Sequence, residues 1–479
     1  MTYSSSPGHW LDFRRERHPL VPALCGIQTL NYRQLATAAA ELAAELVARG
    51  VIRRQVVAVQ LSSSGQIAQL LYAALHLGIT LLPLDPQLMV RHRDRLLAAV
   101  GCQTLICEQP PSTAAVHGIS STALFCGRAG RDALPLDRPH PLEGDQVQLI
   151  IATSGTTGEP KGVLLSAANL AASVAASEQR LGLREGDRWL ACLPLFHIGG
   201  LSILLRCLAA GARVLLQEGF DAVRVWRQIA AGAVTHLSLV PAMLEQLLLQ
   251  SAGVPPPATL RVVLVGGGPL FGALAQRAHT AGWPLCVSYG MSETASQFAT
   301  DCSAQAGLMP GRVGLPLAGY EVAIGEAGRI RVRGPAVMQG YANTGGVTGQ
   351  GLEQGWFETG DLGSLDEQGR LTVIGRADDL LVSGGKNIHP AEVEERLLQC
   401  PGVRAVGVTG RPDPVWGVTL VALFMGDVTA GELDQWARQH LPGHLRPREF
   451  LPVRQLPLNR MGKLARPALR ELLARNDPG

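Results

Sequence analysis

Short apolar runs alternate with helix-period segments along most of the chain. An apolar run at 56–61 is followed by a helical pattern at 65–78 and by a second apolar run at 79–84. The same alternation returns at 213–241 and at 260–282. Strands that alternate with helices form parallel sheets covered on both faces, so the pattern predicts an α/β fold.

The pattern changes near residue 310. Short strands punctuated by glycine follow one another there, as in "GRIRVRG", "GWFETGD" and "GRLTVIGR", and predict a smaller antiparallel subdomain over 310–376. Beyond 375–387 the chain reads as an α+β unit. Its expected elements are a helix at 390–400, strands near 403–409 and 418–425, and a helix at 430–440. The 479 residues exceed the roughly 250–300 at which one core stops growing, so we expect at least two domains.

Charge, hydropathy and cysteine spacing narrow the class of protein. The net charge is +3 and the basic residues are scattered, which gives no reason to expect a nucleic-acid partner or a membrane surface. No apolar run reaches the ~18 residues of a spanning helix, and the N-terminus has no apolar signal region. Nine cysteines at irregular spacing, without a C-x-x-C pair, predict reduced thiols. We therefore expect a cytoplasmic protein without membrane insertion.

The segment "IIATSGTTGEPKGVLL" carries the most specific chemistry. An apolar strand runs into a loop of small residues: Thr153, Ser154, Gly155, Thr156, Thr157 and Gly158. Glycines let backbone N–H groups turn toward an anion, hydroxyls add donors, and Lys161 adds a positive charge, which suits a polyphosphate. The loop is not a Walker loop, since Glu159 and Pro160 separate its last glycine from the lysine.

Lysine is rare among the basic residues. Of 42 Lys and Arg side chains only Lys161, Lys386 and Lys463 are lysines, so arginine is used wherever charge alone is wanted. An ammonium is a compact point charge on a flexible stem, whereas a guanidinium is broad and planar. A role that needs a mobile point charge is therefore expected at some of these positions.

Six motifs in order resemble the adenylate-forming family of acyl-CoA synthetases, luciferases and nonribosomal-peptide adenylation domains. They are "TSGTTGEPKG", "VGGGPL", "SYGMSETAS", "GWFETGDLG", "GRADDLLVSGGKNIHPAEVE" and "LPLNRMGKLAR". The resemblance covers almost the whole chain. It implies an ATP- and acid-binding domain over 1–376, a hinge over 377–383 and a mobile catalytic and CoA-binding domain over 384–479. It also implies ATP, Mg²⁺ and CoA as the small molecules used, and a possible homodimer.

The resemblance implies roles at the phosphates. Ser292, where the family usually has Thr, contacts the α-phosphate, and Glu293 together with Thr157 binds Mg²⁺. Lys463 is the adenylation lysine, which enters for the first half-reaction and leaves when the second domain rotates. Lys386 stands at a position that the family does not hold to lysine.

The resemblance also implies a nucleoside site. Tyr289 stacks on adenine, and the base is lined by backbone of the glycines Gly266, Gly267, Gly268 and Gly290. Asp361 accepts from the ribose hydroxyls because a carboxylate can take two vicinal O–H groups, and Arg376 assists on the ribose and phosphate side.

The resemblance also implies a hinge position and positions that contact CoA. Asp378 stands at the position about which family members rotate. Gly384 and Gly385 form part of the wall along which the CoA thiol arm enters. Trp416 either lines that tunnel or packs in a core.

The segment "LPLFHIGGLSILLRCL" bears on which acid the protein activates. By resemblance His197 lines or gates the acyl pocket, to which Gly290 also contributes. Arg206 lies on the apolar helix that follows, about two turns beyond the mouth. A lone arginine there either snorkels, pairs with a protein carboxylate, or receives a second anion on the substrate.

Together with "THLSLVPAML" and "SYGMSETASQ", this segment looks most like the o-succinylbenzoate-CoA ligases of menaquinone biosynthesis, whose acid has two carboxylates. Three alternatives remain open: another aryl- or acyl-CoA ligase, a stand-alone adenylation enzyme that loads a carrier protein, and a nucleotide-binding regulator without catalysis. Retention of Lys161, Glu293, Asp361 and Lys463 argues against the last.

Overall fold

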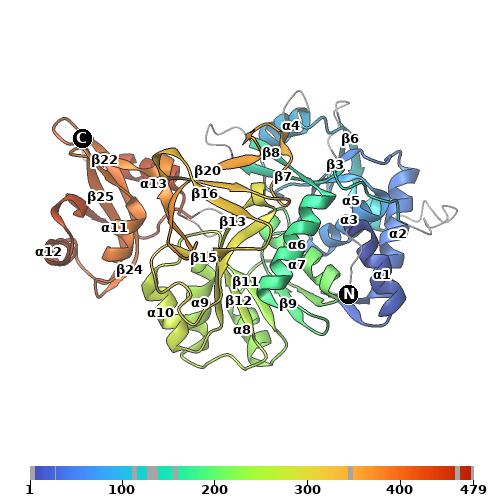
Figure 1. Cartoon of the computed structure of the whole chain (residues 1–479), viewed down its shortest axis with the longest axis horizontal. Coiled ribbons are helices and arrows are strands. Elements are labelled where there is room, and N and C mark those ends of the chain that lie inside the picture. Colours follow the sequence, from blue (N-terminus) through green and yellow to red (C-terminus); the bar gives the residue numbers. More distant parts are fainter. Residues whose placement is uncertain are drawn as a thin grey trace.

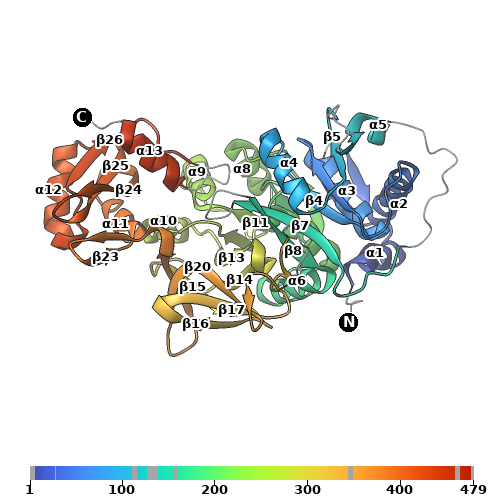
Figure 2. The same cartoon turned by 90° about the horizontal axis from the view of Figure 1, so that it is seen from above.

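The structure is a computed structural model that describes residues 6–26, 28–110, 116–126, 139–154, 160–342, 349–458 and 464–475. A large body holds two sheets, and a small C-terminal domain lies at one end of the molecule (Figure 1). Figure 2 shows the sheet of β3–β6 near the opposite end, with helices packed around both sheets. The expected α/β class with a small α+β C-terminal domain is confirmed.

The larger sheet joins a parallel half to an antiparallel half. Its order is β16-β17-β20-β21-β15-β14-β13-β12-β11-β9-β10-β1-β2. The parallel strands are β1 (Pro22–Cys25), β9 (Arg188–Ala191), β10 (Arg213–Leu216), β11 (His236–Leu239), β12 (Val262–Val265) and β13 (Leu285–Met291). The antiparallel strands are β2 (Thr29–Asn31), β14 (Ser296–Asp301), β15 (Arg312–Pro316), β16 (Glu321–Ile324), β17 (Arg329–Arg333), β19 (Leu352–Glu353), β20 (Trp356–Leu365) and β21 (Leu371–Arg376).

The second sheet has the order β18-β8-β7-β4-β3-β5-β6 and carries the phosphate-loop segment. Its strands are β3 (Val56–Gln60), β4 (Thr80–Pro83), β5 (Thr104–Cys107), β6 (His117–Ser120), β7 (Val147–Ser154), β8 (Pro160–Ser166) and β18 (Gly340–Ala342). Strands β3 to β7 run parallel, whereas β8 and β18 pair antiparallel. The segment predicted to hold a polyphosphate thus begins at the end of β7 and finishes on β8, and these two strands pair antiparallel.

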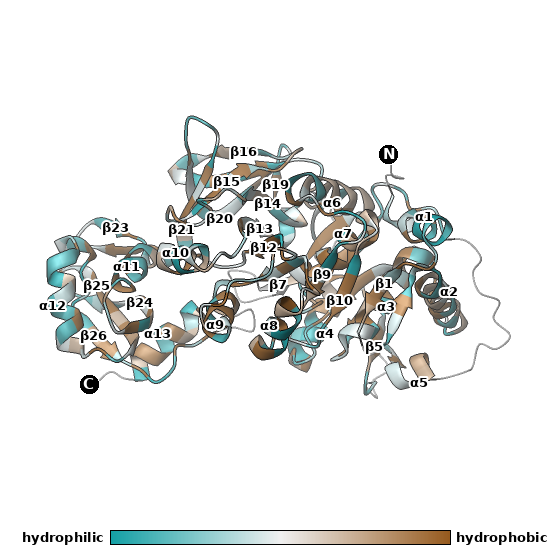
Figure 3. Cartoon of the chain, turned by 90° about the horizontal axis from the view of Figure 1, so that it is seen from below, coloured by the Kyte–Doolittle hydropathy of each residue, from teal (hydrophilic) through white to brown (hydrophobic). Residues whose placement is uncertain are grey.

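Helices cover the sheets of the body. They are α1 (Trp10–Arg17), α2 (Tyr32–Ala48), α3 (Ser64–Leu77), α4 (Val90–Ala99), α5 (Ser121–Cys126), α6 (Ala167–Leu181), α7 (Ile198–Ala210), α8 (Ala222–Ala230), α9 (Pro241–Ser251) and α10 (Gly272–Thr280). Hydrophobic residues concentrate on inner strands and on α7, while α2 carries a hydrophilic outer face (Figure 3). No helix in the described ranges is both long and apolar enough to cross a membrane.

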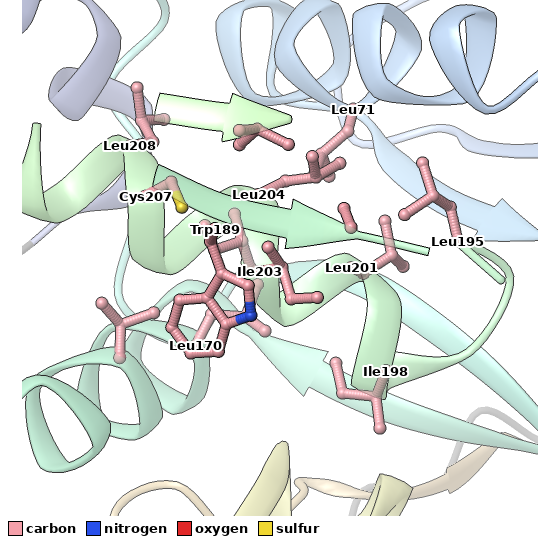
Figure 4. Packing of buried hydrophobic residues seen from close by; sticks show 14 of the residues in the cluster. Leu71, Leu170, Trp189, Leu195, Ile198, Leu201, Ile203, Leu204, Cys207 and Leu208 are labelled. Carbon is pink, nitrogen blue, oxygen red and sulfur yellow. The ribbon is translucent and has the colours of Figure 1, made fainter. Parts of the chain in front are cut away.

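Helix α7 lies in the middle of the main core. Its residues Leu201 and Leu204 pack among side chains from neighbouring elements, including Leu170 of α6 and Trp189 of β9 (Figure 4). Gly200 permits the close approach at its start, because a Cβ there would lie 2.4 Å from the carbonyl oxygen of Pro194. The helix is therefore held tightly on all sides, and any polar group on it is deeply desolvated.

The C-terminal domain has its own core. Strands β24 (Val403–Asp413), β25 (Gly417–Gly426) and β26 (Glu449–Pro452) form its sheet, with helices α11 (Pro390–Leu397), α12 (Ala430–His440) and α13 (Arg466–Arg475). A short hairpin of β22 (Leu381–Ser383) and β23 (Lys386–Ile388) precedes it. Both strands and both helices expected before residue 441 are present, and β26 and α13 are additional.

One pair of cysteines departs from the expectation of reduced thiols. Cys286 of β13 and Cys302, just after β14, are joined by a disulfide, with their Cα atoms 4.2 Å apart. The physical reason is the antiparallel register, which pairs Val287 with Asp301 and so brings the two cysteines face to face. The expectation is wrong for this pair because spacing along the sequence does not reveal a cross-strand neighbour.

Candidate active site

Strand ends from both sheets converge on one region toward the middle of the molecule (Figures 1 and 2). Gly266 follows the end of β12, and Met291 ends β13 beside it. Carboxyl ends of neighbouring parallel strands lie at the same edge of a sheet, which is where α/β proteins bind ligands. Strand β7 ends here too, with Thr153 opposite Lys161 on β8.

Three predicted nucleoside residues form a connected polar chain. The Tyr289 hydroxyl donates to Asp361 Oδ2 at 2.6 Å, and Arg376 Nη1 lies 3.5 Å from Asp361 Oδ1. Asp361 is buried, whereas the Arg376 side chain is about half exposed. Burial, reinforced by the Asp361 charge, raises the pKa of Tyr289, so its hydroxyl stays protonated as a donor. The expected adenine-stacking residue therefore also orients the expected ribose ligand.

Glu293 lies in the short 3₁₀ turn η2 (Ser292–Thr294), together with Ser292. Its Oε1 accepts a hydrogen bond from the Tyr341 hydroxyl at 2.7 Å. The Lys161 ammonium lies 5.1 Å from the centroid of the Tyr341 ring. Sequence reasoning missed Tyr341, since "QGYAN" lies outside the quoted motifs and its contacts depend on the pairing of β18 with β8.

Arg206 is the most unusual charge in the structure. Only 3% of this side chain is exposed, although its Nη2 donates to Ser296 Oγ at 3.1 Å. Its Nε has no hydrogen-bond partner, and no carboxylate of the described residues pairs with it. Burial lowers the pKa of Arg206 to about 10, so it remains charged at neutral pH. The snorkelling and ion-pair interpretations of Arg206 are both wrong for the described residues.

Other groups surround Arg206. Its guanidinium carbon lies 5.6 Å from the ring centroid of Trp189, which provides a cation–π contact. Ser202 Oγ lies 3.5 Å from Ser296 Oγ. Gly290 of β13 lets β14 approach closely, because a Cβ at Gly290 would lie 2.0 Å from the carbonyl oxygen of Ser296. His197 precedes α7 as its N-cap residue and is half-buried beside Phe196.

The predicted CoA positions lie on the C-terminal domain. Gly384 has φ of +56°, and a Cβ on it would lie 2.7 Å from the ring of Trp416. Trp416 is 45% exposed, with the Arg448 guanidinium carbon 5.2 Å from its ring centroid. The core-packing alternative for Trp416 is therefore wrong. Gly385 is exposed at the same turn.

The domains also touch through a side chain that sequence reasoning missed. Glu395 of α11 accepts a hydrogen bond from the backbone N–H of Gly272, the first residue of α10, at 3.1 Å.

The predicted hinge residue Asp378 lies 3.7 Å from Arg376 Nη2. Lys386 is exposed on β23. Five predicted site residues lie outside the described residues: Gly155, Thr156, Thr157, Gly158 and Lys463.

Comparison with known proteins agrees with this arrangement. A model of the family described as AMP-binding enzyme matches residues 11–342, and one of the AMP-binding enzyme C-terminal domain matches residues 392–463.

The chain belongs to the AMP-binding enzyme family.

A relative from Bacillus mycoides, named 2-succinylbenzoate–CoA ligase, is 35% identical to this AMP-binding enzyme over 88% of this chain and 90% of its own. The o-succinylbenzoate CoA synthetase of Bacillus subtilis is 33% identical, and its complex with the acyl-adenylate intermediate superposes with a TM-score of 0.87 over 98% of both chains. Its complex with ATP and magnesium ion also gives 0.87, covering 96% of this chain and 99% of the other. A double mutant bound to a product analogue, OSB-NCoA, gives 0.72 over 97% and 98%.

Glu293 is the carboxylate in this region that we consider as a magnesium ligand. No group of three His, Cys, Asp or Glu side chains within the described ranges is arranged to hold a metal ion. Magnesium does not need such a group, since it keeps several waters and binds one or two carboxylates together with substrate phosphates. Glu293 fits, because Tyr341 occupies Oε1 and no described residue hydrogen-bonds to Oε2.

Proposed function

We propose that this AMP-binding enzyme is an acid–CoA ligase that activates 2-succinylbenzoate, also called o-succinylbenzoate. The acid carboxylate attacks the α-phosphorus of ATP and pyrophosphate leaves. The thiol of CoA then attacks the carbonyl of the acyl-adenylate and AMP leaves, giving o-succinylbenzoyl-CoA. The names of similar relatives support the assignment, and a place for the reaction in menaquinone biosynthesis is part of the proposal.

The observation that carries the acid assignment is the buried charge of Arg206. A desolvated cation without an anionic partner costs several kcal/mol, and a protein keeps one where a ligand completes it. The only hydrogen-bond acceptor given to Arg206 by the described residues is the neutral hydroxyl of Ser296. An acid with two carboxylates meets this need, because one is activated while the other pairs with Arg206. His197, at the start of the same helix, lies toward the reacting end.

The first half-reaction uses the residues at the strand ends. Asp361 accepts from the ribose, with Arg376 beside it. The backbone from Gly266 to Gly268 lines the base, against Tyr289. At the phosphates the proposed contacts are Thr153, Ser154, Gly155, Thr156, Thr157, Gly158, Lys161 and Ser292.

In this step the negative charge on the phosphates is stabilised by Lys161, by Lys463 and, through the metal ion, by Glu293. A magnesium ion held at this site would offset the negative charge that develops on the phosphate oxygens. Glu293 holds the ion with Thr157, and the two lysines bring ammonium groups to the phosphates. The second half-reaction requires Lys463 to withdraw, by rotation about Asp378, so that CoA enters along Gly384, Gly385 and Trp416. The cytoplasmic location and the homodimer remain predictions.

Replacing Arg206 tests the acid assignment. In Arg206→Ala we expect the KM for o-succinylbenzoate to rise by about 100-fold, since a charge-assisted hydrogen bond is lost in a desolvated site. The KM for ATP should change less than about twofold. Pyrophosphate release is measured with o-succinylbenzoate and with 4-oxo-4-phenylbutanoate, the same acid without its ring carboxylate.

The ratio of kcat/KM for the two acids is the deciding quantity. Wild type should favour the dicarboxylate strongly, and Arg206→Ala should lose most of that preference. Arg206→Lys serves as the control that keeps a charge without the planar fork. An unchanged ratio in Arg206→Ala rules out the proposed contact, and omission of CoA distinguishes a ligase from an enzyme that loads a carrier.

A further inference from the structure

The phenol of Tyr341 lies between two groups of opposite charge. Its hydroxyl donates to Glu293 Oε1 at 2.7 Å, while the Lys161 ammonium lies 5.1 Å from its ring centroid. The three side chains come from three separate elements, β18, η2 and β8. Within the described residues Lys161 has no carboxylate partner. Its ammonium group lies over the face of the Tyr341 ring instead.

The ring of Tyr341 is fixed by its surroundings. Strand β18 pairs with β8, with Tyr341 opposite Val163. The ring packs against the backbone at Gly351, where a Cβ would lie 2.7 Å from Tyr341 Cε2. A glycine is therefore required beside the ring, and the phenol has little freedom to turn away from Glu293.

A second bond ties the same segment to Glu293. The backbone N–H of Met338 donates to the Glu293 carbonyl oxygen at 2.8 Å. Residues 338–341 thus hold Glu293 by both its main chain and its side chain. Strand β8 belongs to the second sheet, whereas the η2 turn lies between β13 and β14 of the larger sheet, so residues 338–341 connect the two sheets.

The two oxygens of the Glu293 carboxylate have different surroundings. A donor on one oxygen fixes the rotamer of a ligating carboxylate and leaves the other oxygen for the ion, which is the usual role of a group behind a metal ligand. The face of the ring attracts the Lys161 ammonium to the same place.

We infer that Tyr341 is a positioning residue, which aligns Glu293 and Lys161 for the magnesium complex of ATP. The inference rests on the proposed function, in which these two residues bind the ion and the phosphates. Tyr341 itself touches neither. Its hydroxyl acts through Glu293 and its ring acts through Lys161, so two substitutions separate the two effects.

The test measures ATP binding by isothermal titration, with Mg²⁺ and with EDTA, on the full chain. In Tyr341→Phe the ring remains and the donor is lost, so the gain in ATP affinity on adding Mg²⁺ should fall by about tenfold while affinity in EDTA is unchanged. In Tyr341→Leu the affinity in EDTA should also fall, by about threefold, because the cation–π contact is lost. Circular dichroism confirms that each variant is folded at the working temperature.

Tyr32→Phe is the matched control. Its hydroxyl donates to the Ala212 carbonyl at 2.9 Å in a different part of the body, so its loss should leave the magnesium dependence as in wild type. Equal losses for Tyr341→Phe with Mg²⁺ and with EDTA would overturn the inference, as would no loss in either. Magnesium-dependent ATP binding in wild type without activity on o-succinylbenzoate would reject the acid assignment and leave the role of Tyr341 standing.

Discussion

Arg206 and His236 are both buried ionisable side chains, and burial disfavours the charged form of each. Arg206 stays charged because its ordinary pKa is far above neutrality, and its burial lowers that pKa only to about 10. His236 on β11 is fully buried, and burial lowers its pKa to about 4, so it is neutral at pH 7. Its Nδ1 lies 2.9 Å from Thr235 Oγ1, and its Nε2 has no hydrogen-bond partner among the residues that the structure describes. Arg206 is the group that we propose to pair with a substrate carboxylate, whereas His236 contributes to the pH dependence of folding.

Acid should destabilise the protein through His236. The unfolded chain protonates near pH 6.5 and the folded chain near 4, so in this interval the unfolded state binds more protons and the free energy of unfolding falls as pH falls. The expected loss is about 2 kcal/mol between pH 7 and pH 5, at about 1.36 kcal/mol per pH unit below 6.5. Urea unfolding at pH 7 and pH 5 measures it. His236→Phe, which keeps a ring beside Trp189, should have a smaller pH dependence; an unchanged one contradicts the assignment.

Single residues were predicted from sequence where a motif or a chemical oddity marked them. Arg206 stood out as a lone charge on an apolar helix, and its burial agrees. Asp361 and Tyr289 were found by resemblance, but the hydrogen bond between them was not, since it joins positions 72 residues apart. Tyr341 was missed for the same physical reason. A neighbour across a sheet leaves no local signal in sequence.

At the scale of elements, α7 depends on two glycines that differ in their surroundings. A Cβ on Gly200 would lie 2.4 Å from the Pro194 carbonyl oxygen, whereas on Gly199 its closest neighbour would be Leu193 Cδ1 at 3.8 Å. The first position has no room for a methyl group and the second has ordinary van der Waals space. Because α7 carries Arg206, the fit at its start also sets the position of that charge.

Alanine at these two glycines should have opposite effects on stability. Gly200→Ala should lower the free energy of unfolding by about 1–3 kcal/mol through overpacking. Gly199→Ala should raise it by about 0.5 kcal/mol, since alanine loses less backbone entropy in a helix. Chemical unfolding of the two variants beside wild type gives both values. A loss of the same size in both would show that space at Gly200 is not the cause.

Local periodicity predicted the alternating strands and helices of the body and the main elements of the C-terminal domain. It did not predict that the antiparallel strands continue the parallel sheet through the pair β14–β15, nor that β26 joins β25 in parallel. Pairing partners depend on tertiary packing, which a short apolar run does not specify. The short β26 and the terminal α13 gave too weak a pattern to be recognised.

At the scale of the whole molecule, ion pairs anchor the residue next to the predicted hinge. Asp379 accepts contacts from Arg466 at 3.8 Å and from Arg470 at 3.5 Å, both on α13. Asp378, on its other side, contacts Arg376 of the body. These contacts tie Asp379 to α13 of the C-terminal domain and Asp378 to Arg376 at the end of β21. We propose that the present arrangement, in which Glu395 of α11 contacts Gly272 of α10, serves the first half-reaction.

Glu395 should favour this arrangement. It supplies the N-terminus of α10 with an acceptor from the other domain, where α10 has no side-chain cap of its own. In Glu395→Ala we expect adenylate formation, followed as pyrophosphate release, to slow by about fivefold, corresponding to about 1 kcal/mol. Thioester formation from supplied acyl-adenylate and CoA should stay near wild type. Glu392→Ala, on the same helix and paired with Arg396 within that helix, is the control. Equal slowing of both half-reactions in Glu395→Ala would contradict this role.

The most direct test of the account is the product formed from o-succinylbenzoate, ATP, Mg²⁺ and CoA, analysed by mass spectrometry. The account predicts o-succinylbenzoyl-CoA, AMP and pyrophosphate in equal amounts, with only the acyl-adenylate when CoA is left out. Absence of both acyl products, while another acid yields its own CoA thioester, would contradict the assignment of the acid.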